Sequence, residues 1–110
     1  MPPRTGVKVK LGGKQRTLRY TSVSLSKLED ERSGEALTRT LYRAGQVSIG
    51  AIGALVWAGL LHDEPNLTVE KATEMIEPPL MPLINGLMEA LDPWTVDPEE
   101  DEEGNGKAAG

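Results

Sequence analysis

The segment of residues 7–20 constrains the fold most, because it alternates apolar and basic residues around a Gly-Gly pair. Side chains of a strand point alternately to opposite faces, so its apolar residues share one face and its lysines share the other. Gly12 and Gly13 supply the positive φ angles that a two-residue hairpin turn requires. The segment therefore predicts an antiparallel hairpin in which Val7 lies opposite Leu18.

This register also predicts where the charges of the hairpin lie. Lys14 falls opposite Leu11 and Arg16 falls opposite Val9, so we expect the apolar face to give way to charge near the turn. An isolated two-stranded hairpin is only marginally stable in water, so it must pack on the rest of the chain or on another chain. The basic residues that we expect to form an exposed tip are Lys8, Lys10, Lys14 and Arg16.

The sequence after the hairpin predicts four or five short helices, which capping residues, glycines and prolines separate. The third of them is the most apolar and is the expected core. Its glycines indicate close packing against neighbouring backbones, since glycine in a helix interior costs about 1 kcal/mol relative to alanine. The first predicted helix is capped by Ser22 or Ser24 and stops at Gly34, and the second covers about 35–44. The third covers about 49–61, is capped by Ser48, and has Ile49 in the apolar stripe expected to face inward. The fourth begins at Asn66 or Thr68 and ends at Pro78, and the last runs from near Pro82 to Asp92-Pro93.

Charge is divided unevenly along the chain, although the net charge is only −5. Residues 1–22 carry six basic and no acidic residues, whereas residues 97–110 carry six acidic residues and one lysine. The acidic segment has no large apolar side chain whose burial could repay the entropy of ordering it. We therefore expect one α+β domain over residues 7–94, a hairpin packed on a small helix bundle, with a flexible N-terminus (1–6) and a disordered acidic tail (95–110).

The composition disfavours several classes of function. The chain has no cysteine, its one histidine, His62, has no evident catalytic partner, and no glycine-rich phosphate loop precedes a helix. We therefore expect no enzymatic activity, no metal and no cofactor. The apolar stretch 47–61 is too short to span a bilayer, and the N-terminus lacks a signal peptide, so we expect a cytoplasmic protein. The basic hairpin could bind nucleic acid phosphates, but the net negative charge favours a solvated face, and a small nucleic-acid-binding module remains the third reading.

The order of these pieces is similar to that of a known family. The hairpin of residues 7–14 continues as Thr-Leu-Arg at 17–19, a Ser-Leu-x-x-Leu-Glu helix follows at 24–29, and Ala-Leu-Val-Trp-Ala-Gly-Leu occupies 54–60. Together they resemble the tail assembly chaperones of long-tailed phages, in the branch found in gene transfer agents and related prophages. The resemblance covers residues 7–91, without the proline-rich linker around Pro78, and does not include the acidic tail.

The resemblance implies a function in assembly. Such chaperones bind the tape-measure protein, keep it soluble and help to recruit tail-tube subunits, in the cytoplasm of the bacterial host. The expected partners are therefore the tape-measure and tail-tube proteins, together with further copies of this chain. Some members of the family carry a tail-tube label, so a structural tail protein is the alternative.

Four residues are candidates for contact with a partner. Trp57 lies in the most apolar helix and is expected in the core, with an interface anchor as the alternative. Trp94 lies next to Pro93 and the acidic tail, where it is harder to bury. Because aromatic residues are enriched at binding hot spots, we expect Trp94, with Leu87 and Leu91, to form part of a partner groove.

Overall fold

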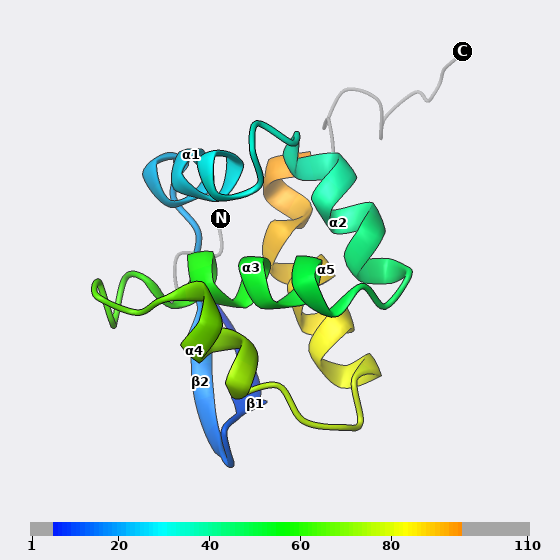
Figure 1. Ribbon diagram of the computed structural model, residues 1–110. Helices are drawn as coiled ribbons and strands as arrows, with labels where there is room; N and C mark the ends of the chain where they lie inside the picture. Colours follow the sequence, from blue (N-terminus) through cyan, green and yellow to red (C-terminus); the bar gives the residue numbers. More distant parts are fainter. Residues whose placement is uncertain (1–5, 96–110) are drawn as a thin grey trace.

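A computed structural model describes residues 6–95 as a hairpin packed on five helices (Figure 1). This confirms the predicted α+β class. The expected flexible N-terminus and acidic tail lie outside the described residues, apart from Gly6 and Thr95. The elements are β1 (Val7–Leu11), β2 (Lys14–Leu18), α1 (Ser22–Glu31), α2 (Leu37–Gly45), α3 (Ile49–Leu60), α4 (Val69–Glu74) and α5 (Met81–Thr95).

The hairpin has the predicted register and turn. Val7 pairs with Leu18, and the turn residues Gly12 and Gly13 have φ angles of 60° and 82°. The expected loss of the apolar face near the turn is wrong, because Leu11 is only 1% exposed. The end of α4 covers this part of the hairpin, where the Gly12 N–H donates to the Met75 carbonyl oxygen at 3.0 Å.

Helix α3 lies at the centre of the domain and contacts β2 and the four other helices (Figure 1). It begins as predicted, with the Ser48 hydroxyl accepting from the Ala51 N–H at 3.3 Å. Its glycines allow neighbours to come close: a Cβ at Gly59 would lie 2.8 Å from both Leu18 and Tyr20. The hairpin therefore docks directly on the backbone of α3.

Several helix ends differ from the prediction. Helix α4 ends at Glu74, ahead of Pro78, with Met75 as its C-terminal cap. Helix α1 is capped by Thr21, whose hydroxyl accepts from the Ser24 N–H at 3.1 Å while the Ser24 hydroxyl accepts from the Thr21 N–H. Helix α5 continues through Pro93 to Thr95. A proline near the last turn removes only one helical donor, and the Thr95 hydroxyl donates to the Leu91 carbonyl oxygen at 3.2 Å. Among the helices of residues 6–95, none has the length and apolar character needed to span a bilayer.

Candidate protein-interaction site

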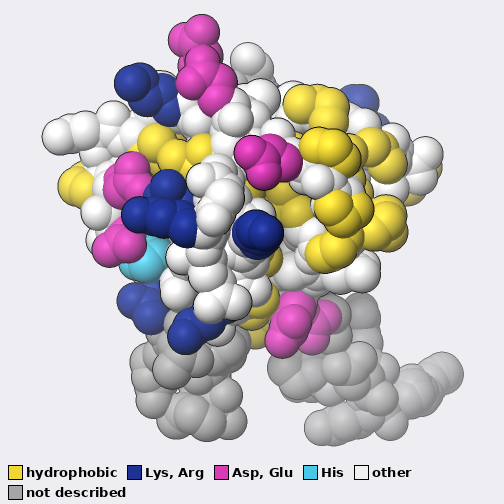
Figure 2. Space-filling view, turned by 90° about the horizontal axis from the view of Figure 1, so that it is seen from below, with side chains coloured by type: hydrophobic (Ala, Val, Ile, Leu, Met, Phe, Trp, Pro, Cys, Tyr) yellow, Lys and Arg dark blue, Asp and Glu magenta, His cyan; other side chains and the backbone are white. Residues whose placement is uncertain are grey.

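An exposed apolar surface forms where the turn between α2 and α3 lies on the same side as the start of α5. Figure 2 shows apolar side chains gathered on this side of the domain, where Figure 1 places both segments. The two are held together because α2 packs on α5, and a Cβ at Gly45 would lie 3.2 Å from the Met88 methyl group. Exposed fractions are 47% for Val47, 45% for Ile49 and 56% for Met81. We call the following exposed residues the apolar surface: Val47, Ile49, Pro78, Pro79, Met81 and Pro82.

Val47 has an unusual backbone conformation for its residue type. Its φ angle is 63°, in the left-handed region that a β-branched residue rarely adopts. Val47 is the left-handed residue of the motif that ends α2. In this motif the Val47 N–H donates to the Ala44 carbonyl oxygen, and the Ser48 N–H donates to the Arg43 carbonyl oxygen. Glycine usually occupies this position because a side chain costs about 1–2 kcal/mol there. The chain thus keeps an exposed apolar side chain at a site where stability favours glycine.

The structure separates the predicted basic tip into two parts. Lys8, Lys10 and Lys14 are exposed, and none of them forms an ion pair within residues 6–95. Arg16 is partly buried instead, since its guanidinium contacts Glu64 at 2.8 Å and donates to the Leu11 carbonyl oxygen at 3.2 Å. Arg16 therefore fastens the hairpin to the loop after α3, and three lysines remain available to a partner.

The four candidate partner residues lie in different environments. Leu87 and Leu91 are fully buried in the core, and Trp94 is 45% exposed on the last turns of α5. Trp57 is partly buried, and its indole N–H donates to the Leu67 carbonyl oxygen at 2.7 Å. The two leucines thus stabilise the fold, and Trp94 is the one of the four that offers a partner a large exposed side chain.

The sequence did not indicate the apolar surface. Ile49 belonged to the stripe expected to face inward, yet it is exposed at the first position of α3. Nearly every residue of α3 is apolar or small, so its pattern does not distinguish a buried face from an exposed one. Met81 begins α5 directly after the proline segment, where the chain enters the helix at the surface. The useful signal would have been the position of apolar residues at helix starts rather than their spacing.

His62 and Tyr20 both have partners within the fold. The His62 Nε2 lies 2.8 Å from the Thr17 carbonyl oxygen, which can only accept, so Nε2 carries the proton. The Tyr20 hydroxyl donates to the Leu55 carbonyl oxygen at 2.6 Å, and burial raises the pKa of Tyr20 far above its usual range. Within residues 6–95, no three His, Cys, Asp or Glu side chains lie close enough together to hold a metal ion.

Glu35 is the centre of a charged cluster that joins α1 to α2. Its carboxylate accepts from the Thr40 hydroxyl at 2.8 Å and from the Arg43 and Arg32 guanidinium groups at 2.7 and 3.2 Å. These hydrogen bonds, those from Thr40 and Arg43 above all, lower the pKa of Glu35 from 4.5 to about 2. The cluster holds the loop between the two helices, just ahead of α2.

We expect the Glu35 cluster to make stability depend on pH in acid. Because the pKa is lower in the folded than in the unfolded state, its contribution is complete above pH 4.5 and is lost as the pH falls towards about 2. In that window, unfolding takes up as much as one proton at Glu35. Urea unfolding of Glu35→Gln and of the wild type should differ most at neutral pH and least in acid. A difference that does not change with pH would contradict this assignment.

Comparisons with protein-family models, with curated proteins and with solved structures found no match to this chain. A proposal for its function therefore has to rest on the surfaces described above, together with the resemblance carried by the hairpin and the two helix motifs.

Proposed function

We propose that this chain is an assembly chaperone of the phage-tail type, which binds a tape-measure protein and keeps it soluble while tail-tube subunits are recruited. The observation that carries the proposal is the apolar surface, in which Val47 stays exposed and left-handed at a cost to stability. Residues in strained backbone conformations cluster at functional and ligand-binding sites. A binding role explains why this position holds valine.

The chemistry of the surface fits a long helical partner. A tape-measure protein presents apolar side chains at helical spacing, and such a helix binds by laying its apolar face against another apolar surface. The surface here is built from a helix-terminating turn, the first turn of α5 and a proline segment whose φ angles are fixed by the pyrrolidine rings. Rigid apolar anchors lose little conformational entropy on binding, which favours affinity.

Co-expression tests the proposal. The tape-measure protein from the same gene neighbourhood should move from the insoluble to the soluble fraction when this chain is produced with it. An unchanged soluble fraction would count against the proposal. Purified chain that polymerises by itself into rings or tubes would favour the structural tail protein instead.

Variants of the apolar surface should separate binding from folding. Val47→Asn suits the left-handed conformation better than valine does, so it should raise the free energy of unfolding by about 1 kcal/mol. The same variant should lower the amount of tape-measure protein kept in solution, because it replaces an apolar contact by an amide. Thermal or urea unfolding and the co-expression assay measure the two effects.

A matched pair of charge substitutions provides the control. Met81→Asp places a carboxylate on the apolar surface, whereas Val23→Asp places one on α1, where Val23 is also exposed. Met81→Asp should abolish solubilisation of the tape-measure protein and Val23→Asp should leave it intact. Equal loss in both variants would mean that the apolar surface is not the binding site.

A further inference from the structure

Within residues 6–95, the outer edge of β1 has backbone groups that no hydrogen bond occupies. In an antiparallel pair, residues alternate between hydrogen-bonded and non-hydrogen-bonded positions, and a two-residue turn makes Leu11 and Lys14 a bonded pair. Lys8 and Lys10 therefore direct their N–H and C=O groups away from β2. No hydrogen bond of these four groups is found within residues 6–95.

The corresponding edge of β2 is covered at one end. The Arg19 N–H donates to the Gly59 carbonyl oxygen at 2.9 Å, and the Thr17 carbonyl oxygen accepts from His62 at 2.8 Å. The end of α3 and the loop after it thus cover the end of the β2 edge that lies away from the turn. On β1, both outward-facing residues keep their backbone groups accessible to a further strand.

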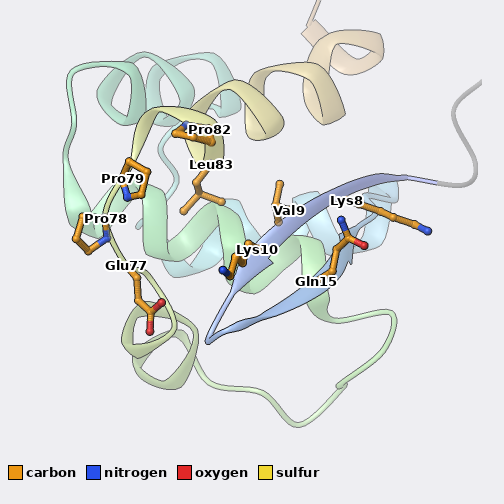
Figure 3. A pocket seen from close by; sticks show the side chains of 9 residues that line it. All are labelled: Lys8, Val9, Lys10, Gln15, Glu77, Pro78, Pro79, Pro82 and Leu83. Carbon is orange, nitrogen blue, oxygen red and sulfur yellow. The ribbon is translucent and has the colours of Figure 1, made fainter.

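A groove of about 300 Å³ lies beside this free edge (Figure 3). The hairpin forms one wall of the groove, and the segment leading into α5 forms the other. The prolines of that segment cannot donate to a strand, so they border the groove without filling the edge. Glu77 is the one carboxylate of the lining, which consists of Lys8, Val9, Lys10, Gln15, Glu77, Pro78, Pro79, Pro82 and Leu83.

The charge of the edge selects among possible strands. If β1 of a second copy paired here, Lys8 and Lys10 would meet the same lysines across the new pair, and like charges opposite each other are destabilising. Exposed lysines on an edge strand generally prevent such self-pairing. An extended acidic segment would instead be attracted to this edge, since its carboxylates neutralise the charges of both lysines.

This chain carries such a segment. Residues 99–103 read Glu-Glu-Asp-Glu-Glu, so alternate side chains are acidic in either register. Because Lys8 and Lys10 are two residues apart on one face of β1, an extended acidic run places a carboxylate opposite each of them. We propose that residues 99–103 of the same chain bind along the free edge of β1, with their carboxylates at Lys8 and Lys10.

The length of the chain beyond α5 suits this assignment. Val9 packs on Gly86, since a Cβ there would lie 2.5 Å from the valine side chain. Gly86 lies nine residues before Thr95, about 14 Å along the helix axis. Residues 99–103 follow Thr95 by four to eight residues, which span at most about 14 to 28 Å when extended, so the acidic run is long enough to reach back to the level of Val9.

Amide hydrogen exchange of the full chain tests the proposal. The wild type is compared with a variant in which the five acidic residues 99–103 are changed to Gln or Asn. The amides of Lys8 and Lys10 should exchange several-fold faster in the variant, because the added strand is lost. The Arg19 amide, which bonds to Gly59 in either case, is the internal reference and should not change. Equal exchange rates at Lys8 and Lys10 in the two proteins would overturn the proposal.

A spin label distinguishes the chain's own segment from that of a second copy. The chain has no cysteine, so Gly104→Cys gives a single attachment site for a nitroxide. The label should cause loss of the Lys8 and Lys10 amide signals, and the signals should return in Lys8→Gln/Lys10→Gln and in about 1 M salt. Loss that persists in the double variant would overturn the proposal. So would loss in a mixture where label and isotope are on different molecules, since the occupant would then be a second copy.

Discussion

Replacing Leu87 by alanine should lower the free energy of unfolding by about 2–5 kcal/mol. Leu87 is fully buried on α5, within the core cluster that also holds α3 and the hairpin. Removing its side chain loses the transfer free energy of the deleted carbons and leaves a cavity that a packed core fills only in part. Urea unfolding followed by far-UV circular dichroism measures the loss.

Trp94→Ala is the matched comparison on the same helix. Trp94 is exposed in part, so truncating it should cost much less stability than truncating Leu87. If Leu87→Ala unfolded at the same urea concentration as the wild type, Leu87 would not be a core residue. We would then again expect it to contact a partner. The pair therefore decides which residues of α5 hold the fold and which remain available to a partner.

Gly59→Ala should also destabilise the protein, by about 1–3 kcal/mol. The added methyl group would lie 2.8 Å from the Tyr20 hydroxyl oxygen and 2.9 Å from Cζ of its ring. Tyr20 cannot move aside easily, because its buried hydroxyl is hydrogen-bonded to Leu55. The hairpin would therefore have to shift away from α3.

Gly50→Ala is the control within the same helix. The nearest atom to a Cβ at Gly50 is the Arg32 Nη1 at 3.7 Å, an ordinary van der Waals contact. Alanine is also the better helix former, so this variant should be neutral or more stable by as much as about 1 kcal/mol. Thermal unfolding of both variants measures the difference. Equal stabilities would show that the close approach of Tyr20 to α3 does not constrain position 59.

The hairpin was predictable from sequence because its determinants are local. A period of two fixes the faces of the strands, and Gly12-Gly13 fix the turn and hence the register. The burial of Leu11 was not predictable, since it depends on Met75, which reaches the turn only through the path of α4. The contact of Arg16 with Glu64 joins residues that are 48 positions apart, and local pattern carries no information on such a pair.

The helices show the same limit. Ser48 caps α3 as predicted, and Thr68, one of the two predicted starts, caps α4, because a cap is a local hydrogen bond. Which apolar residues face solvent was decided by the packing of α2 on α5 and of both on α3. The expected groove on α5 placed Leu87 and Leu91 beside Trp94, whereas the fold buries both leucines and exposes Met81 at the other end of the same helix.

The central claim is that this chain acts by binding a tape-measure protein. The composition of the soluble complex tests this claim most directly. Size-exclusion chromatography with light scattering would be applied to the material soluble after co-expression. We expect one peak that contains both proteins, present with Val23→Asp and absent with Met81→Asp. In the wild-type sample, two separate peaks, one for the tape-measure protein and one for this chain, with no peak that contains both, would contradict the account.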